Sequence, residues 1–294
     1  MVKSGFVSIV GRPNVGKSTL INAMVGEKIA IVTDKPQTTR TRIQGIFTNT
    51  QGQIVFIDTP GIHKPKHLLG EYMVRVSTRT LMEVDIVYYM TDVTKRFGGG
   101  EQFILDQLKD INVPVFLLVN KIDLVTAEEV QNYIQDFTCH MNFREVIPLS
   151  AVQGKNIPLL LEKTFADLPE GPLYYPEDDL TDQPVSFIVS ELIREKALIL
   201  TRDEVPHSLA VEIEEFKNHQ DKKVYIRAVL YTERESQKGI MIGKSGQMLK
   251  TIGEQSRQEI EKFLQTRVYL DLWVKVKKNW RDSETNLGQL GYHL

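Results

Sequence analysis

Two patterns of hydrophobic and polar positions divide this chain. Up to about residue 165, short apolar runs are separated by longer amphipathic segments, and the apolar runs read "FVSIV", "IVFID", "IVYYMTDV", "VPVFLLVN" and "REVIPLS". Apolar runs of this length are typical of strands buried on both faces, and the segments between several of them are typical of helices. The first pattern therefore predicts an α/β domain with a mostly parallel sheet and helices on both faces.

Proline and acidic residues separate the two patterns. The segment "LPEGPLYYPEDDLTDQP" contains four prolines, which prevent a continuous helix, and an acidic cluster, which favours solvent. The prolines are Pro169, Pro172, Pro176 and Pro184. We therefore predict a first domain at 1–168, a linker at 169–184, and a second domain with a C-terminal tail at 185–294.

The second pattern combines strand-like and helical periods. The runs "SLAVEIEEF" and "KVYIRAVLYTE" precede, and "RVYLDLWVKV" follows, the segment "SQKGIMIGKSGQMLKTIGEQSRQEIEKFL". That segment predicts a short helix, a loop at 243–246 and a longer helix whose apolar face carries Leu249, Ile252, Ile260 and Phe263. The second domain is therefore expected to be α+β.

Composition narrows the class of protein. The chain has 294 residues, of which 41% are hydrophobic and 25% charged, and this is typical of a folded protein with two domains. The single cysteine, Cys139, excludes an internal disulfide framework, and the longest apolar stretch, at 113–119, is too short to span a membrane. We therefore expect a cytoplasmic protein. Residues 185–294 carry 18 Lys and Arg against 16 Asp and Glu, so the basic balance lies in the second domain.

A glycine-rich loop follows the first apolar run and opens a predicted helix. Its sequence, "GRPNVGKS", fits the pattern GxxxxGK[ST], in which two glycines let backbone amides point at phosphate oxygens. Lys17 supplies a positive charge to the β and γ phosphates, and Ser18 supplies an oxygen to Mg²⁺. The alternative is a plain strand-to-helix turn. Phosphate contacts are expected from Gly11, Arg12, Pro13, Asn14, Val15, Gly16, Lys17, Ser18 and Thr19.

The sequence "NKID" ends another apolar run, at the sheet edge where α/β folds bind ligands. The Asp123 carboxylate can accept hydrogen bonds from N1–H and the 2-amino group of guanine, whereas adenine offers neither donor. After the next run, the Ala151 amide can reach guanine O6, although the third residue of this element, usually Lys, is Val152. We therefore expect guanine to be bound by Asn120, Lys121, Ile122, Asp123, Ser150 and Ala151.

Between these motifs, "DTPG" ends a predicted strand. Asp58 can hold Mg²⁺ through water, and the Gly61 amide can sense a γ-phosphate. In isolation the string would be an ordinary turn, but its place between the two other motifs favours a nucleotide site. Upstream, the polar segment 34–42 carries Thr38 and Thr39, either of which can complete the Mg²⁺ shell. Further nucleotide contacts are expected from Asp58, Thr59, Pro60, Gly61 and Ile62.

The strings "GRPNVGKST", "KPQTTR", "DTPG" and "NKID", in this order, resemble the Era family in the translation-factor-related branch of Ras-like GTPases. The resemblance implies Mg²⁺-dependent GTP hydrolysis, with Thr39 as the Mg²⁺ ligand beside Ser18 and Asp58. Ile62 stands where Ras-like proteins keep a water-orienting Gln, so slow intrinsic turnover is expected. Relatives with an Asn in this loop can recruit K⁺, which makes Asn14 a candidate K⁺ ligand. The residues expected to act on the reacting phosphate are Lys17, Thr39 and Gly61.

A second "GKS", at 243–245, lacks the spacing of a phosphate loop because Gly239 stands one residue too close. Its setting, two helices joined by GxxG among strands, resembles a type II KH module, in which the glycines let about four nucleotides be clamped. Residues 238–281 hold ten basic against four acidic residues, which favours a polyanion. A plain helix-to-helix turn is the alternative. RNA contacts are expected from Ile240, Ile242, Gly243, Lys244, Ser245, Gly246, Lys250, Lys275, Lys277 and Lys278.

Two tryptophans interleave with basic residues in "WVKVKKNWR". Bases could stack on Trp273 and Trp280, and a pattern of Trp and Lys also fits anionic lipid. The alternation in "YLDLWVKV" favours a third interpretation for Trp273, burial in the core of a strand, and this is the one we predict.

The Era resemblance covers nearly the whole chain. It implies a GTP-binding and GDP-binding factor that binds 16S ribosomal RNA near its 3′ end, acts in assembly of the 30S subunit and rRNA maturation, and associates peripherally with the inner face of the cell membrane. We also expect a monomer. The residues themselves support a guanine-nucleotide switch joined to a single-stranded RNA reader. Two alternatives remain: a P-loop kinase that transfers the γ-phosphate to a small molecule, and a constitutive RNA-binding module whose nucleotide site is structural.

Overall fold

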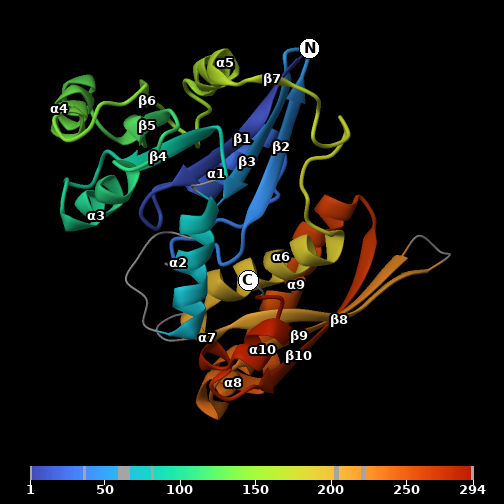
Figure 1. The fold of residues 1–294 in the computed structure, drawn as a ribbon. Helices are drawn as coiled ribbons and strands as arrows, with labels where there is room; N and C mark the ends of the chain where they lie inside the picture. The colour runs from blue at the N-terminus through green and yellow to red at the C-terminus, as the bar shows by residue number, and fades with distance from the viewer. Residues whose placement is uncertain are drawn as a thin grey trace. The chain divides into compact units, whose positions relative to one another are not determined.

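The protein is described by a computed structural model that covers residues 2–35, 38–58, 67–80, 83–201, 205–219 and 223–292. These residues form two compact units, whose elements are labelled in Figure 1. Of the described residues, the first unit contains those in 2–30, 39–58 and 72–182, and the second contains those in 31–38, 67–71 and 183–292. The short segment 31–38 therefore belongs with the C-terminal half of the chain.

The strands of the first unit are β1 (Val2–Val10), β2 (Ile43–Asn49), β3 (Gly52–Asp58), β4 (Ile86–Asp92), β5 (Val115–Asn120), β6 (Glu145–Pro148) and β7 (Glu170–Gly171). Among the described residues they form one sheet in the order β2-β3-β1-β4-β5-β6, and β7 pairs with β1. The neighbours from β3 to β6 are parallel, whereas β2 and β7 are antiparallel to their partners. The predicted, mostly parallel sheet is confirmed.

Helices cover both faces of this sheet. They are α1 (Lys17–Val25), α3 (Gly99–Leu108), α4 (Ala127–Thr138) and α5 (Ile157–Asp167), and α2 (Leu68–Thr80) spans residues of both units. Successive side chains of a strand point to opposite faces, so Val7 and Ile9 pack with Leu20 of α1 and with α5, while Val10 packs with Leu105 of α3 and with α4. The apolar runs are continuous because both faces are buried.

Strand β2 was not predicted from the sequence pattern, and it explains where the linker lies. The backbone amide of Ile46 donates to the carbonyl of Leu180 at 2.9 Å, and the amide of Gln44 donates to Asp182 Oδ1 at 3.1 Å. The free edge of β2 is thus paired by the end of the linker, so backbone groups that would otherwise face solvent are satisfied.

A buried glutamine holds the middle of the linker. Gln53 on β3 is fully buried, and its Oε1 accepts from the amides of Tyr174 and Tyr175, both at 2.9 Å. Its Nε2 donates to the carbonyl of Tyr175 at 3.0 Å. Residues 174–182 therefore pack as part of the first unit, while the acidic cluster at 177–179 is exposed, as its composition indicated.

The second unit has a three-stranded sheet in the order β10-β9-β8, with helices on one face. In β9 the side chains of Val224, Ile226, Ala228 and Leu230 are buried at every second position and pack against α6, α8 and α9, and Val229 between two of them is buried as well. No helix in the described part of the chain is long and apolar enough to cross a membrane. The elements are α6 (Val185–Leu200), α7 (Val205–Ser208), β8 (Ala210–His219), β9 (Lys223–Thr232), α8 (Glu235–Ile242), α9 (Gln247–Leu264), β10 (Arg267–Val276) and α10 (Glu284–Gln289).

Candidate functional site

The glycine-rich loop 11–16 connects β1 to α1. Gly16 has a φ of 110°, and a Cβ placed on it would lie 2.3 Å from Nδ2 of Asn120. Only glycine fits there, because a side chain would meet both an unfavourable backbone conformation and a buried neighbour. Helix α1 begins at Lys17 with no acidic residue in its first turn. Its free amides and the helix dipole therefore present positive potential to an anion at the loop.

Lys17 lies folded over this loop. Its side chain is 7% exposed, and Nζ donates to the carbonyls of Gly11 at 3.2 Å and Arg12 at 3.1 Å. Burial lowers the pKa of Lys17 to about 8, although the nearby Asp58 carboxylate acts in the opposite direction. Carbonyl oxygens are weak partners for a buried ammonium group, so an anionic phosphate in the loop would be a stronger one.

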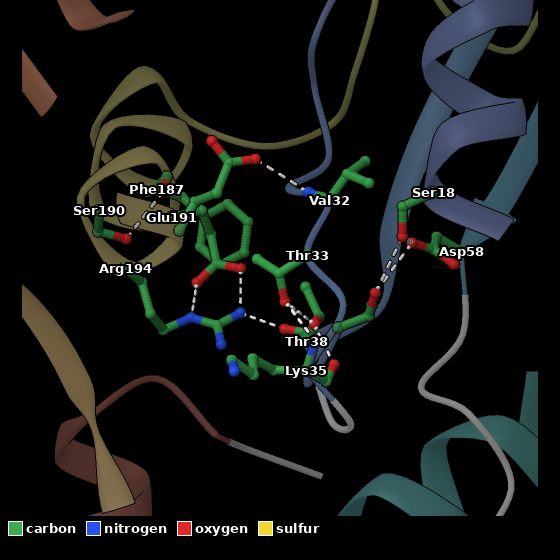
Figure 2. Close-up of polar contacts among 12 residues, drawn as sticks. Ser18, Val32, Thr33, Lys35, Thr38, Asp58, Phe187, Ser190, Glu191 and Arg194 are labelled. Atoms are coloured by element: carbon green, nitrogen blue, oxygen red, sulfur yellow. Dashed lines mark hydrogen bonds and ion pairs between the residues drawn. The ribbon is translucent and has the colours of Figure 1, made fainter. Parts of the chain in front are cut away.

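Three side-chain oxygens meet beside the first turn of α1. Ser18 Oγ donates to Asp58 Oδ2 at 2.7 Å, and Thr39 Oγ1 donates to the same oxygen at 3.2 Å; Ser18 and Asp58 are labelled in Figure 2. The two hydroxyl oxygens are 3.1 Å apart. Burial raises the pKa of Asp58 above its ordinary value, although Lys17 and the two hydroxyls act in the opposite direction. The residue pattern left Thr38 and Thr39 as alternatives and the family resemblance implied Thr39, and Thr39 is the one that reaches this cluster.

This cluster fits Mg²⁺. The second carboxylate oxygen of Asp58, Oδ1, is buried and has no hydrogen-bond partner within the described part of the chain. A hard, oxygen-seeking cation would satisfy that oxygen, and hydroxyl and carboxylate oxygens are the ligands that Mg²⁺ prefers. Ser18, Thr39 and Asp58 could therefore hold the metal, directly or through water.

Asn120, at the end of β5, connects two of the predicted motifs. Its Nδ2 donates to the carbonyl of Val15 at 2.8 Å, and its Oδ1 accepts from the amide of Ala151 at 3.0 Å. The following residue, Lys121, has a φ of 66° and donates from Nζ to the carbonyl of Asn14 at 3.1 Å. The phosphate loop and the loops expected to bind the base are thus joined by side chains.

Asp123 follows the end of β5 and lies, exposed, on a short 3₁₀ helix, Ile122–Leu124. Ala151 is buried, and Ser150 Oγ accepts from the amide of Gln153 at 3.2 Å. Val152, at the position usually taken by Lys, is 81% exposed, so its side chain does not cover this loop. The carboxylate of Asp123 is accessible to a base brought to this edge of the sheet.

Four predicted contact residues fall outside the described part of the chain, and the structure gives no information on them. They are Thr59, Pro60, Gly61 and Ile62.

Two acidic residues next to the loop were missed by the sequence reasoning. Asp92 ends β4 and accepts from Lys121 Nζ at 2.5 Å. Burial raises the pKa of Asp92, but the hydrogen bonds from Lys121 and Thr94 lower it by more, so the pKa lies below its ordinary value. Glu101 on α3 is 3% exposed and accepts from Arg12 Nη1 at 3.2 Å with each carboxylate oxygen. The position of Asp92 at a strand end was a signal, whereas nothing near Glu101 in the sequence points to Arg12.

The GxxG loop joins α8 to α9 in the second unit. Gly243 has a φ of 73°, and a Cβ there would lie 2.6 Å from Cβ of Met248, so this position requires glycine. Ser245 and Gly246 also have positive φ, of 52° and 78°. The loop thus turns sharply and leaves its own backbone accessible beside the start of α9.

A groove of about 370 Å³ runs from this loop along α9 to β10. Arg257 was missed by the sequence reasoning, although it stands two helical turns after Lys250 and so shares its face. The groove combines apolar side chains, two glycines, two basic groups and one carboxylate, Glu254, and the glycines and basic groups suit a nucleic-acid strand. It is lined by Gly246, Leu249, Lys250, Gly253, Glu254, Arg257, Leu270 and Leu272.

The residues predicted to bind RNA do not all lie at this groove. Leu270 and Leu272 of β10 line the groove. Successive side chains of a strand point to opposite faces, and Lys275 is an odd number of residues from both, so it points to the other face of the sheet. There its Nζ contacts Glu214 Oε1 at 2.7 Å. Lys277 donates to Gln289 Oε1 at 2.7 Å. Of the rest, Ile240, Lys244, Ser245 and Lys278 are exposed and Ile242 packs against the core.

The prediction that Trp273 is buried is wrong. Its side chain is 54% exposed, on the same open face of the sheet as Tyr269, which is 66% exposed. The alternation was correct, but only one face of this sheet is covered by helices among the described residues. Trp280 is the buried tryptophan, and its indole nitrogen donates to the carbonyl of Ser208 at 2.9 Å.

Comparisons with known proteins agree with both units. Residues 6–121 match a family model described as 50S ribosome-binding GTPase, and residues 204–281 match a KH domain model. A GTPase Era from Clostridium botulinum is 53% identical over 292 residues, with 99% of each chain covered. One from Staphylococcus haemolyticus is 50% identical over 290 residues, with 99% of this chain and 97% of the relative covered.

The chain belongs to the Era family of GTPases. Two solved structures cover 100% of this chain and of their own, each at 40% identity. An Era variant from Aquifex aeolicus bound to GDP and AlF₄⁻ has a TM-score of 0.96. Era in complex with MgGDPNP and nucleotides 1506–1542 of 16S ribosomal RNA has a TM-score of 0.97. The family predicted from the motifs is confirmed, and this family member is an enzyme that binds and hydrolyses GTP.

Proposed function

We propose that this Era-family GTPase is a GTP-driven switch that binds the 3′ region of 16S ribosomal RNA in its KH groove and acts in assembly of the 30S subunit. The observation that carries the proposal is the groove beside Gly243 and Gly246, where Lys250 and Arg257 line an accessible surface. A protein 40% identical over the full chain was solved with nucleotides 1506–1542 of that RNA. Basic groups along a groove supply affinity for phosphates, and the glycines allow close approach of the strand.

In the nucleotide site, each group has a proposed task. The amides of residues 11–18 and the Lys17 ammonium bind the β and γ phosphates, and Asp123 selects guanine through its two donors. Ser18, Thr39 and Asp58 hold Mg²⁺, which neutralises charge on the phosphate oxygens when it is bound. Support comes from Oδ1 of Asp58, which is buried and has no hydrogen-bond partner among the described residues, and from the position of Lys17 over the loop.

The attacking water needs a partner other than a side-chain amide at position 62, where this chain has Ile. We include in the proposal that the Gly61 amide contacts the γ-phosphate and that K⁺ binds at Asn14 beside the phosphates. Asn14 is exposed on the loop at a φ of 65°, and its carbonyl is held by Lys121. A monovalent cation there would add positive charge where the transition state gains negative charge.

The experiment compares RNA affinity in two nucleotide states. The full chain is titrated with a fluorescent RNA of the 3′ end of 16S rRNA, in the presence of Mg²⁺ and either a non-hydrolysable GTP analogue or GDP. A switch requires different affinities, because a ligand shifts a state only by its differential binding. A scrambled RNA of equal length is the control.

Equal affinities in both states would favour the alternative, a constitutive RNA-binding module with a structural nucleotide site. Equal affinities for the native and scrambled RNA would overturn the assignment of the 3′ end.

A further inference from the structure

The segment that leads to Thr39 is held by the second unit. Ile31 is 3% exposed and packs in the same core cluster as Ile188, Val189 and Leu192 of α6. The amide of Val32 donates to Glu195 Oε1 of the same helix at 3.0 Å, a contact drawn in Figure 2. Residues 31–38 are therefore anchored at their start by burial and by a charge-assisted hydrogen bond.

Arg194 of α6 holds the end of that segment. Its guanidinium is 1% exposed and makes a bidentate pair with Glu191, from Nε to Oε1 and from Nη2 to Oε2, each at 2.6 Å. The same Nη2 donates to the carbonyl of Thr38, as Figure 2 shows. Thr38 is fixed further, because its hydroxyl donates to the carbonyl of Lys35 at 2.6 Å and lies 2.7 Å from the hydroxyl of Thr33.

The contact from Arg194 to Thr38 is costly to lose. Burial lowers the pKa of Arg194, but the neighbouring Glu191 carboxylate raises it by more. The pKa of Arg194 therefore lies above its ordinary value, and the guanidinium is charged. Its Nη1 is buried and has no hydrogen-bond partner in the part of the chain that the structure describes. If Thr38 moved away, Nη2 would keep Glu191 but lose the Thr38 carbonyl, and a further N–H of this buried guanidinium would be left without an acceptor among the described residues. Arg194 therefore favours one position of the Thr38 carbonyl.

The carbonyl of Thr38 belongs to the peptide unit that carries the amide of Thr39. A single peptide unit thus connects the oxygen held by Arg194 to the residue whose hydroxyl contacts Ser18 and Asp58. Fixing a peptide plane at its carbonyl restricts where the next side chain can point, since only φ of Thr39 and its side-chain torsion χ1 separate that plane from the Thr39 hydroxyl. Neither Arg194 nor Glu191 is part of any nucleotide motif in the sequence.

We propose that Arg194 is a positioning residue for GTP hydrolysis: by holding the Thr38 carbonyl, it places the Thr39 hydroxyl for Mg²⁺. The inference rests on the proposed function, because it takes Thr39 as a Mg²⁺ ligand. Arg194 acts through Thr39 and does not contact the nucleotide. Its loss should therefore raise the Mg²⁺ requirement of the GTP-bound state and leave binding of GDP without Mg²⁺ unchanged.

The test is a double-mutant cycle on the full chain, with Arg194→Met, Thr39→Ala and both together. The Mg²⁺ concentration for half-maximal GTP hydrolysis is measured, and GDP affinity is measured without Mg²⁺. Residues that orient a metal ligand typically contribute about 10-fold or more to metal affinity, so Arg194→Met should raise the Mg²⁺ requirement by about 10-fold. In the Thr39→Ala background it should add no further increase, because the two residues act on one ligand.

Arg227→Met is the matched control. Arg227 lies in the same unit and donates from Nε to Asp271 Oδ2 at 3.0 Å, but it is 42% exposed on the open face of the sheet. Its loss should leave the Mg²⁺ requirement unchanged. If Arg194→Met is unfolded by circular dichroism, Arg194→Lys replaces it, because a single ammonium cannot keep the bidentate pair and the Thr38 contact. At least a threefold rise in the Mg²⁺ requirement is then expected, and a wild-type value overturns the inference.

The outcomes separate the inference from the proposed function. If Thr39→Ala has a normal Mg²⁺ requirement, Thr39 is not a Mg²⁺ ligand, and both proposals about it are overturned. If Thr39→Ala is shifted and Arg194→Met is not, only the positioning role of Arg194 is overturned. The positioning role would also be overturned if the Mg²⁺ requirement of the double variant rose by the product of the two single fold-changes, since Arg194 would then act independently of Thr39.

Discussion

Asn120 donates a hydrogen bond from Nδ2 to the carbonyl oxygen of Val15 at 2.8 Å, which joins the end of β5 to the phosphate loop. The same side chain accepts from the buried amide of Ala151 at 3.0 Å. One residue therefore fixes the distance between the loop that holds phosphates and the loops expected to hold the base. Preorganisation of this kind reduces the ordering that nucleotide binding would otherwise require.

Replacing Asn120 by Ala should weaken nucleotide binding and destabilise the first unit. The change leaves the Val15 carbonyl and the Ala151 amide buried without their partner, and an unsatisfied buried group costs about 1–3 kcal/mol. We expect at least about 10-fold weaker GDP binding by calorimetry, on the scale of 1.4 kcal/mol per factor of ten. Gln102→Ala, which removes an exposed contact to Asp106, is the control and should leave both GDP affinity and the urea midpoint unchanged. Wild-type GDP affinity in Asn120→Ala would contradict the joining role.

Asp123→Asn should change the base that the enzyme prefers. The carboxylate offers two acceptors to guanine, whereas an amide offers one acceptor and one donor. Xanthine, with an N1–H donor and a carbonyl at position 2, matches the amide. We expect the affinity for GTP to fall by about 10³-fold or more and the affinity for xanthosine triphosphate to rise, measured by competition with a fluorescent nucleotide. Asp136→Asn, on the exposed side of α4, should change neither affinity. Retained preference for GTP in Asp123→Asn would remove Asp123 from the base site.

Lys250 and Lys275 should differ in their effect on RNA binding, because the structure puts them on opposite faces of the β10 sheet. Lys250→Ala should weaken binding of the 3′ rRNA fragment and reduce the slope of log K against log salt by about 1. Lys275→Ala should leave both nearly unchanged, because Lys275 lies away from the groove, on the face where it contacts Glu214. The opposite result would place RNA on the open face, with Tyr269 and Trp273.

GTP hydrolysis should be faster in K⁺ than in Na⁺ if Asn14 binds a monovalent cation. At constant ionic strength and saturating Mg²⁺, replacing NaCl by KCl should raise kcat severalfold in the wild-type enzyme. Asn14→Ala should lose this stimulation and keep its affinity for GDP. Equal rates in the two salts would exclude the K⁺ site.

Trp280 and Trp273 should contribute differently to stability. Trp280→Phe leaves the carbonyl of Ser208 without its donor and creates a small cavity, so it should lower the free energy of unfolding by about 1–3 kcal/mol. Trp273→Phe, at a site that is 54% exposed, should change it by less than about 0.5 kcal/mol. Urea denaturation followed by circular dichroism measures both. Similar losses in the two variants would mean that the open face is covered in solution.

The motif loops could be predicted from the sequence because their requirements are local. Gly16 and Gly243 are needed by backbone dihedrals and by close neighbours, and such needs are expressed in the residue type itself. The buried strands of the first unit were also predictable, because burial on both faces requires a continuous apolar run. Chain order then brought these loops to one edge of the sheet.

Other features depended on partners far away in the chain. Glu101 contacts Arg12 across 89 positions, and β2 is stabilised by the end of the linker, which gave no strand pattern of its own. Which face of β10 is covered decided that Trp273 is exposed and that Lys275 lies away from the groove.

The sequence alone determined the family, the nucleotide loops and the alternation of buried and exposed side chains, since each follows from short-range steric and hydrogen-bonding demands. The residue pattern left Thr38 and Thr39 as alternatives and only the family resemblance pointed to Thr39; the tertiary structure placed Thr39 beside Ser18 and Asp58, and it alone showed that Arg194 holds the carbonyl of Thr38. Two adjacent threonines are alike in local chemistry. They differ because their neighbours come from segments more than 100 residues apart, which pack by burial of apolar surface that no short pattern encodes.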